Sequence, residues 1–177
     1  MSTPKQAIGT NPRSYSRPLY TPEQRAKRDA SVWTSVQGVL APLQFLVFLV
    51  SLSLVLRYLS TGDGFLTAVW SIVIKTMVLY TIMITGCIWE KVVFGRYLFA
   101  PAFYWEDVFS MLVLGLHTAY LAALATDALS ANHLMYLALA AYLTYVINAG
   151  QFIWKLRLAR LDQARQHAAL SSEGMAA

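Results

Sequence analysis

Four long runs of apolar residues dominate the chain, at residues 36–59, 65–89, 108–126 and 134–154. Each run has about 20 residues or more, which is the length that an α-helix needs to cross the hydrocarbon layer of a membrane. The pattern therefore predicts an all-α integral membrane protein whose four transmembrane helices form a bundle over residues 33–155. A basic segment at residues 1–32 precedes the bundle, and a basic tail at residues 156–177 follows it.

The composition supports a membrane protein. Hydrophobic residues make up 57% of the chain and charged residues only 13%, whereas a water-soluble domain has about 25% charged residues. The first apolar run begins only at residue 36, so we expect no cleaved signal peptide. The single cysteine, Cys87, lies among apolar residues and is expected to be a packed thiol without a redox role.

Basic residues predict the orientation of the bundle. They gather before the first run and after the last, whereas the expected outer loops at residues 60–64 and 127–132 contain no Lys or Arg. Both termini are therefore expected in the cytoplasm. The net charge of +5 is concentrated beside the membrane spans, which favours anionic lipid headgroups over nucleic acid as the partner.

The N-terminal segment contains the start signal of a short helix. Residues 1–19 are rich in Ser, Thr, Pro and Gly, and we expect them to be disordered. Thr21 then reads as a helix cap, Pro22 as the first helical residue and Gln24 as the closing residue of a capping box. We expect a surface helix that leads into Trp33.

Each predicted span also carries polar residues at helical spacing, so that the polar side chains of four helices face one interior. Such residues often only form hydrogen bonds between neighbouring helices. This structural interpretation is favoured for the first span, and it remains as open as a functional one for Asn148 and Gln151. The residues concerned are Gln37, Gln44, Ser51, Lys75, Gly86, Glu90, Glu106, Ser110, His117, Tyr145, Asn148 and Gln151.

The most informative segment lies at residues 89–107, where the carboxyl groups of Glu90, Glu106 and Asp107 interrupt an apolar sequence. Carboxyl groups at a membrane edge point to chemistry. Helix capping is an equal alternative for Asp107, and Lys91 and Arg96 are equally explained as charges that set the topology. Aromatic residues nearby fit an interfacial belt; they are Trp89, Tyr97, Tyr104 and Trp105.

Two ionisable residues, Lys75 and His117, fall near the middle of the membrane. A charge is costly there, so Lys75 is expected to be neutral, to extend toward an interface or to meet a partner. His117 fits a hydrogen-bonded bundle histidine and a ligand to the metal of a bound macrocycle equally well. The chain contains no glycine-rich phosphate loop, paired-cysteine metal site or HExxH motif.

Four ordered segments carry a resemblance to a known family. They are residues 41–48 (APLQFLVF), 89–95 (WEKVVFG), 98–107 (LFAPAFYWED) and 145–152 (YVINAGQF). They resemble the 3-vinyl bacteriochlorophyllide hydratase family of phototrophic bacteria, over a match from about residue 20 to residue 160. The resemblance implies a multi-pass hydro-lyase in the bacterial inner or intracytoplasmic photosynthetic membrane, beside other enzymes of bacteriochlorophyll synthesis.

The implied reaction adds water to the C3 vinyl group of chlorophyllide a or 3-vinyl bacteriochlorophyllide a and gives a 3-(1-hydroxyethyl) product. An acid protonates the terminal vinyl carbon, and water attacks the cation that the macrocycle stabilises. No cofactor is needed, because magnesium arrives within the substrate. A carboxyl group in an apolar pocket suits the first step, since burial favours its protonated form.

The roles of individual residues are hypotheses. Glu90 or Glu106 is the acid, and the other of the two, or Asp107, positions water. Lys91 and Arg96 hold the propionate of the pigment, and His117 or Asn148 meets its magnesium. Glu106 and His117, however, lie about 16 Å apart along one helix, so one ring does not reach both. The side chains expected to bind the pigment are Lys91, Arg96, His117, Asn148, Gln151, Gln44, Tyr104 and Trp105.

Two other classes of protein compete with the hydratase. A non-catalytic four-helix carrier of tetrapyrrole pigment needs the same aromatic pocket and magnesium ligand but no acid. A quinone-binding membrane subunit also uses His, Gln and Trp at the interface, but it leaves chlorophyllide unchanged. Replacement of Glu90 or Glu106 by Gln separates the hydratase from the carrier, because only the hydratase needs the acid.

Overall fold

The computed structural model describes residues 19–176, except for the side chains of residues 162 and 165–176. This part of the chain contains five α-helices and no strand. The helices are α1 (Pro22–Ala30), α2 (Val32–Thr61), α3 (Phe65–Phe94), α4 (Tyr104–Ala125) and α5 (Ala131–Ala176). α2, α3, α4 and residues Ala131–Leu161 of α5 are long and apolar enough to cross a membrane. The prediction of an all-α chain with four apolar spans is confirmed.

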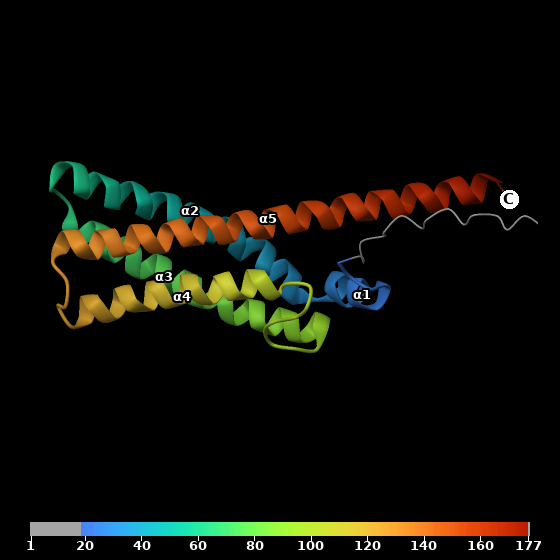
Figure 1. Cartoon of the computed structure of the whole chain (residues 1–177), viewed down its shortest axis with the longest axis horizontal. Coiled ribbons are helices and arrows are strands. Elements are labelled where there is room, and N and C mark those ends of the chain that lie inside the picture. The colour runs from blue at the N-terminus through green and yellow to red at the C-terminus, as the bar shows by residue number, and fades with distance from the viewer. Residues whose placement is uncertain (1–18, 177) are drawn as a thin grey trace, which may run out of the picture.

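The four long helices form two antiparallel hairpins, α2 with α3 and α4 with α5 (Figure 1). Packing within each hairpin is much more extensive than packing between the hairpins. The tight α2–α3 link contains Gly62 and Gly64, whose φ angles of 78° and 84° are left-handed and suit glycine. We call the end of the bundle with these links the hairpin end, and the end beside α1 the terminal end.

The N-terminal segment packs onto the terminal end. The predicted capping box is confirmed, since the Thr21 hydroxyl accepts a hydrogen bond from the Gln24 N–H at 3.2 Å and the Gln24 side chain accepts one from the Thr21 N–H at 2.9 Å. Tyr20 is buried against Phe94 and Phe103, and this burial raises the pKa of its phenol. Of the segment predicted to be disordered, Leu19 is half-buried beside Tyr20, whereas residues 1–18 lie outside the described residues.

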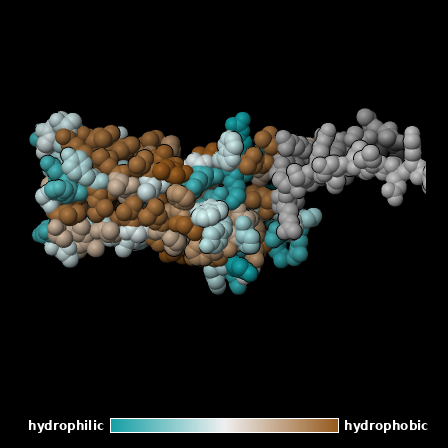
Figure 2. All heavy atoms as spheres, in the orientation of Figure 1, coloured by the Kyte–Doolittle hydropathy of each residue, from teal (hydrophilic) through white to brown (hydrophobic). Residues whose placement is uncertain are grey.

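The surface has an apolar belt between two more polar ends (Figure 2). Large apolar side chains of α3 and α5, such as Leu66, Trp70 and Leu143, are more than 60% exposed. Apolar surface of this extent is normal in a bilayer, whereas a water-soluble monomer rarely exposes it. The belt therefore supports the assignment of α2–α5 as membrane spans.

Helix α5 continues far beyond the bundle. It runs unbroken through residue 155 to Ala176 and extends past the other helices at the terminal end (Figure 1). The predicted boundary between residues 155 and 156 therefore falls inside one helix. The division into residues 1–32, 33–155 and 156–177 stays a prediction.

Candidate active site

Two carboxyl groups meet at the terminal end of the bundle, one from each hairpin. Glu90 lies in the last turns of α3 and Asp107 in the first turn of α4, and both are about 95% buried. The two carboxyl groups are near neighbours, because they face consecutive peptide N–H groups of the α3–α4 loop. Two buried carboxylates side by side repel each other, which favours a proton on one of the two groups.

The α3–α4 loop encloses this pair with its backbone. Gly95 ends α3 with a φ of 80°, and the chain then turns back at Phe99, which has a φ of 57°. A positive φ is uncommon for a phenylalanine. It allows the Phe99 N–H to donate to Asp107 Oδ2 at 2.8 Å and the next N–H, of Ala100, to approach Glu90 Oε2 at 3.4 Å. Two consecutive peptide groups thus hold the two carboxyl groups in place.

Glu106 has a different partner from Glu90 and Asp107. Its Oε2 lies 2.6 Å from Nζ of Lys155 on α5, and the side chain of Glu106 is only 10% exposed. The Lys155 ammonium also lies 5.0 Å from the centre of the Phe103 ring. Glu106 thus has a charge-assisted hydrogen bond to a cation, which Glu90 lacks.

Lys155 was not among the predicted site residues, because it counts among the basic residues that set the membrane topology. A signal was present, since Gln151 and Asn148 precede it by four and seven residues and lie on the same face of α5.

Neither Glu106 nor Asp107 caps α4, whose N-cap Phe103 has no side-chain cap bond.

A second polar layer lies about one turn deeper. Asn148 Nδ2 donates to Ser110 Oγ at 2.8 Å, which leaves the buried Asn148 Oδ1 without a protein partner. Oε1 of Gln151 and both amide atoms of Gln44 are also buried without a partner. Buried polar groups are nearly always hydrogen-bonded, so these open positions indicate where a ligand or water fits.

A third layer lies near the middle of the membrane. Lys75 Nζ of α3 is 2.8 Å from Nε2 of His117 on α4, and Nδ1 of His117 is 2.8 Å from the Val113 carbonyl. Of the three arrangements predicted for Lys75, the structure shows the one in which it meets a partner, here His117. Both ring nitrogens of His117 are occupied, so a bond to magnesium would require the displacement of Lys75.

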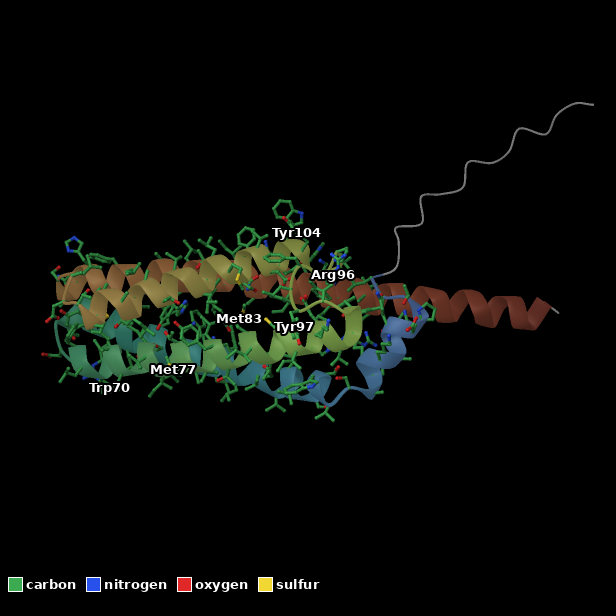
Figure 3. All side chains as sticks on the ribbon, turned by 90° about the horizontal axis from the view of Figure 1, so that it is seen from below. Trp70, Met77, Met83, Arg96, Tyr97 and Tyr104 are labelled. Atoms are coloured by element: carbon green, nitrogen blue, oxygen red, sulfur yellow. The ribbon has the colours of Figure 1, made fainter. Side chains whose placement is uncertain are left out.

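The remaining predicted residues lie on the outside of the bundle. Arg96 and Tyr97 are on the α3–α4 loop and Tyr104 points outward from the start of α4 (Figure 3). Trp105 is 67% exposed, and exposed Lys91 donates to the Gly95 carbonyl at 3.0 Å. The structure therefore brings Glu90, Asp107, Glu106, Asn148, Gln151 and Gln44 into the interior, but not Lys91, Arg96, Tyr104 and Trp105.

Together, the four apolar spans and the buried carboxyl groups define a polytopic α-helical membrane protein with a candidate acid–base site at one end of its bundle. The chain belongs to the 2-vinyl bacteriochlorophyllide hydratase family, whose model matches residues 20–158. The vinyl group is numbered 2 in the older convention for the macrocycle and 3 in the systematic one used above.

Two curated relatives support the family assignment. A 2-vinyl bacteriochlorophyllide hydratase of Cereibacter sphaeroides is 68% identical over 153 residues, which cover 86% of this chain and 95% of the relative. A protein of the same name from Rhodobacter capsulatus is 67% identical over 150 residues, or 85% of this chain and 87% of the relative. No solved structure matches the chain.

Proposed function

We propose that this protein is a hydro-lyase that adds water to the vinyl group of chlorophyllide a or 3-vinyl bacteriochlorophyllide a in bacteriochlorophyll synthesis. The observation that carries the proposal is the burial of Glu90 and Asp107 side by side, at consecutive peptide N–H groups of one loop. Hydration of a vinyl group needs a protonated acid in an apolar site, and two buried neighbouring carboxyl groups favour such a proton. The family match and the names of the two relatives support the same reaction.

In this proposal Glu90 delivers the proton. Asp107 accepts the shorter of the two backbone hydrogen bonds, from Phe99 at 2.8 Å, whereas the Ala100 N–H is 3.4 Å from Glu90. Hydrogen bonds from N–H groups favour the ionised form of a carboxyl group. Asp107 is therefore the carboxylate of the pair and Glu90 the acid, which transfers its proton to the terminal vinyl carbon.

Glu106 then directs the water. Its carboxylate pairs with Lys155, and the unpaired Oε1 of Gln151 lies one turn from Lys155 on α5. A carboxylate and an amide oxygen both accept hydrogen bonds from water. They hold the water so that its oxygen attacks the internal vinyl carbon while Glu106 accepts the released proton.

Asn148 meets the magnesium of the pigment through its free Oδ1, directly or through a water. Amide oxygen is a ligand type that magnesium accepts. Ser110, the partner of Asn148, follows Asp107 by three residues, or about 4.5 Å along α4. A ring with its metal at Asn148 therefore brings its vinyl group close to the carboxyl pair, whereas His117 lies about 15 Å from Asp107. The reaction uses no cofactor of the protein's own.

The proposal places the enzyme in the inner or intracytoplasmic membrane of a phototrophic bacterium, with both termini in the cytoplasm. α1 and the extension of α5 lie at the same end of the bundle (Figure 1). Exposed basic residues at this end fit anionic lipid headgroups. The pigment thus meets the carboxyl groups at the cytoplasmic edge of the membrane.

Complementation tests the proposal. Bacteria that lack their own vinyl hydratase gene should regain 3-(1-hydroxyethyl) pigments when they express this chain, and the Glu90→Gln variant should fail although it accumulates in the membrane. Glu23→Gln is the control, because Glu23 is exposed on α1 and pairs with the exposed Lys27, away from the carboxyl pair. Unchanged vinyl pigments with the wild-type chain, at normal abundance, would contradict the hydratase and favour a pigment carrier.

A further inference from the structure

Lys75 is a fully buried amine that the proposed reaction does not use. Its relative exposure is 0%, and its Nζ lies 4.3 Å from the centre of the Tyr145 ring and 5.1 Å from that of Tyr142. None of the ion pairs seen among the described residues includes Lys75. The position lies ten residues into the second membrane span.

The partner of Lys75 supplies no negative charge. Because Nδ1 of His117 faces the Val113 carbonyl at 2.8 Å, Nδ1 carries the hydrogen, and Nε2 accepts from the Lys75 ammonium. The two tyrosine rings add cation–π attraction but no charge. A charged ammonium in a membrane interior without a counter-charge is costly, so an anionic group brought beside Lys75 would be favoured there.

Further hydrogen bonds fix the position of this site. The hydroxyl of Tyr142 bonds with Ser51 of α2, and Ser51 bonds with Ser71 of α3. The Tyr142 ring under the ammonium is thereby held from two other helices. His117 is itself buried and bonded to the Val113 carbonyl, so it offers Nε2 to Lys75 from a fixed position.

The substrate class of the proposed function carries a suitable anion. A chlorophyllide has a free propionate carboxylate on the pyrrole ring next to the one that bears the C3 vinyl group, and the propionate arm projects away from that vinyl group. With the vinyl group at Glu90 and the magnesium at Asn148, the propionate points deeper into the bundle. Tyr145, which contacts Lys75, precedes Asn148 by three residues, or about 4.5 Å along α5.

We propose that Lys75 binds the propionate carboxylate of the pigment and that His117 holds the ammonium in position. This inference rests on the proposed function. It replaces Lys91 and Arg96 in that role, because both lie at the surface near the vinyl side of the ring. The enzyme consequently selects the free acid over pigment that is esterified at the propionate.

The test compares chlorophyllide a with its propionate methyl ester on the purified full chain. Wild-type protein should bind and hydrate the free acid at least roughly tenfold better, as expected for a charge-assisted hydrogen bond. Lys75→Met should lose this preference and should process the methyl ester as well as wild type does. Lys91→Met is the matched control and should keep the preference.

Two outcomes would overturn the inference: a wild-type enzyme without the preference, or a preference that disappears in Lys91→Met and persists in Lys75→Met. Should Lys75→Met not fold, the salt dependence of free-acid binding to wild type decides, since a buried pair is screened far less than a surface pair. Affinity that is insensitive to salt is expected, and affinity that falls steeply would contradict the inference. Failure of the hydratase itself is distinct, because neither pigment would then gain water.

Discussion

Glu90 of α3 and Asp107 of α4 lie side by side between the two hairpins, where two consecutive peptide N–H groups of the connecting loop face their carboxyl groups. In the proposed mechanism, one of these two buried carboxyl groups supplies the protonated acid. The following predictions test what this pair and the layers beneath it contribute to structure and to function.

The Glu90→Gln variant should bind pigment normally and lose turnover. The Gln amide can still bond to Asp107 but has no proton of suitable acidity, so kcat is expected to fall by about 10²–10⁴. Single-turnover measurements on purified protein, beside pigment titrations, check this result. Glu23→Gln, on the exposed face of α1, serves as the control. Retention of wild-type kcat in Glu90→Gln would exclude Glu90 as the acid.

Removal of Lys155 should destabilise the bundle through Glu106. Lys155→Met leaves the nearly buried Glu106 carboxylate without its partner, and the free energy of unfolding is expected to fall by about 3 kcal/mol. The double variant Lys155→Met with Glu106→Gln should recover most of this loss, because no uncompensated charge remains. Thermal unfolding in detergent measures both. A double variant as unstable as the single one would contradict a charge-based origin.

Magnesium-free pigment tests the role of Asn148. Wild-type protein should bind chlorophyllide a more tightly than pheophorbide a by roughly tenfold, or about 1.4 kcal/mol. Asn148→Leu should bind the two pigments equally, because the free Oδ1 is gone. Asn132→Leu, at an exposed position of the hairpin end, should keep the preference. A preference for magnesium that persists in Asn148→Leu would exclude Asn148 as the ligand.

Phe103 should be a major anchor of the terminal end. Its ring contacts Tyr20, Trp89, Phe94 and Phe152, and it is 2% exposed. Phe103→Ala is expected to lower the free energy of unfolding by about 3–5 kcal/mol. Trp105→Ala, two residues away and 67% exposed, should change it by less than about 0.5 kcal/mol. Equal unfolding temperatures for the two variants would contradict this assignment.

The orientation can be tested with a membrane-impermeant thiol reagent in a Cys87→Ser background. Glu23→Cys and Arg160→Cys lie at the terminal end and should react only from the cytoplasmic side, whereas Asp127→Cys at the hairpin end should react only from the outside. Labelling of Glu23→Cys from the outside would reverse the proposed orientation and move the carboxyl site to the other face of the membrane.

The spans could be predicted because a long apolar segment crosses a bilayer as an α-helix, which satisfies all its backbone hydrogen bonds. The ends of the helices could not be predicted, since a helix can continue through polar residues beyond the membrane interface. α5 shows this most clearly: no Pro or Gly interrupts residues 151–173, so the helix continues beyond the apolar run that ends at Trp154. The capping box at Thr21 was predictable because its contacts are local.

The candidate site was predictable in its residue types but not in its pairing. Glu106 and Asp107 are neighbours in sequence, but Glu90 comes close to Asp107 only because the loop turns back at Phe99 with a positive φ. A positive φ is usually taken by glycine, so the sequence does not predict this turn. The Glu106–Lys155 pair joins residues 49 positions apart on different helices. Helical spacing predicts on which face of its helix a residue lies, but not which helices are neighbours. The side-chain pairs between helices could therefore be identified only from the structure.

Hydration in H₂¹⁸O tests the central claim most directly. Purified full-length protein is incubated with chlorophyllide a, and in parallel with 3-vinyl bacteriochlorophyllide a, without added cofactor, and the pigment is then analysed by mass spectrometry. We predict the gain of one labelled water with at least one of the two pigments, with the ¹⁸O in the new hydroxyethyl group. Pigments that both bind and both return unchanged would contradict the hydratase and indicate a carrier.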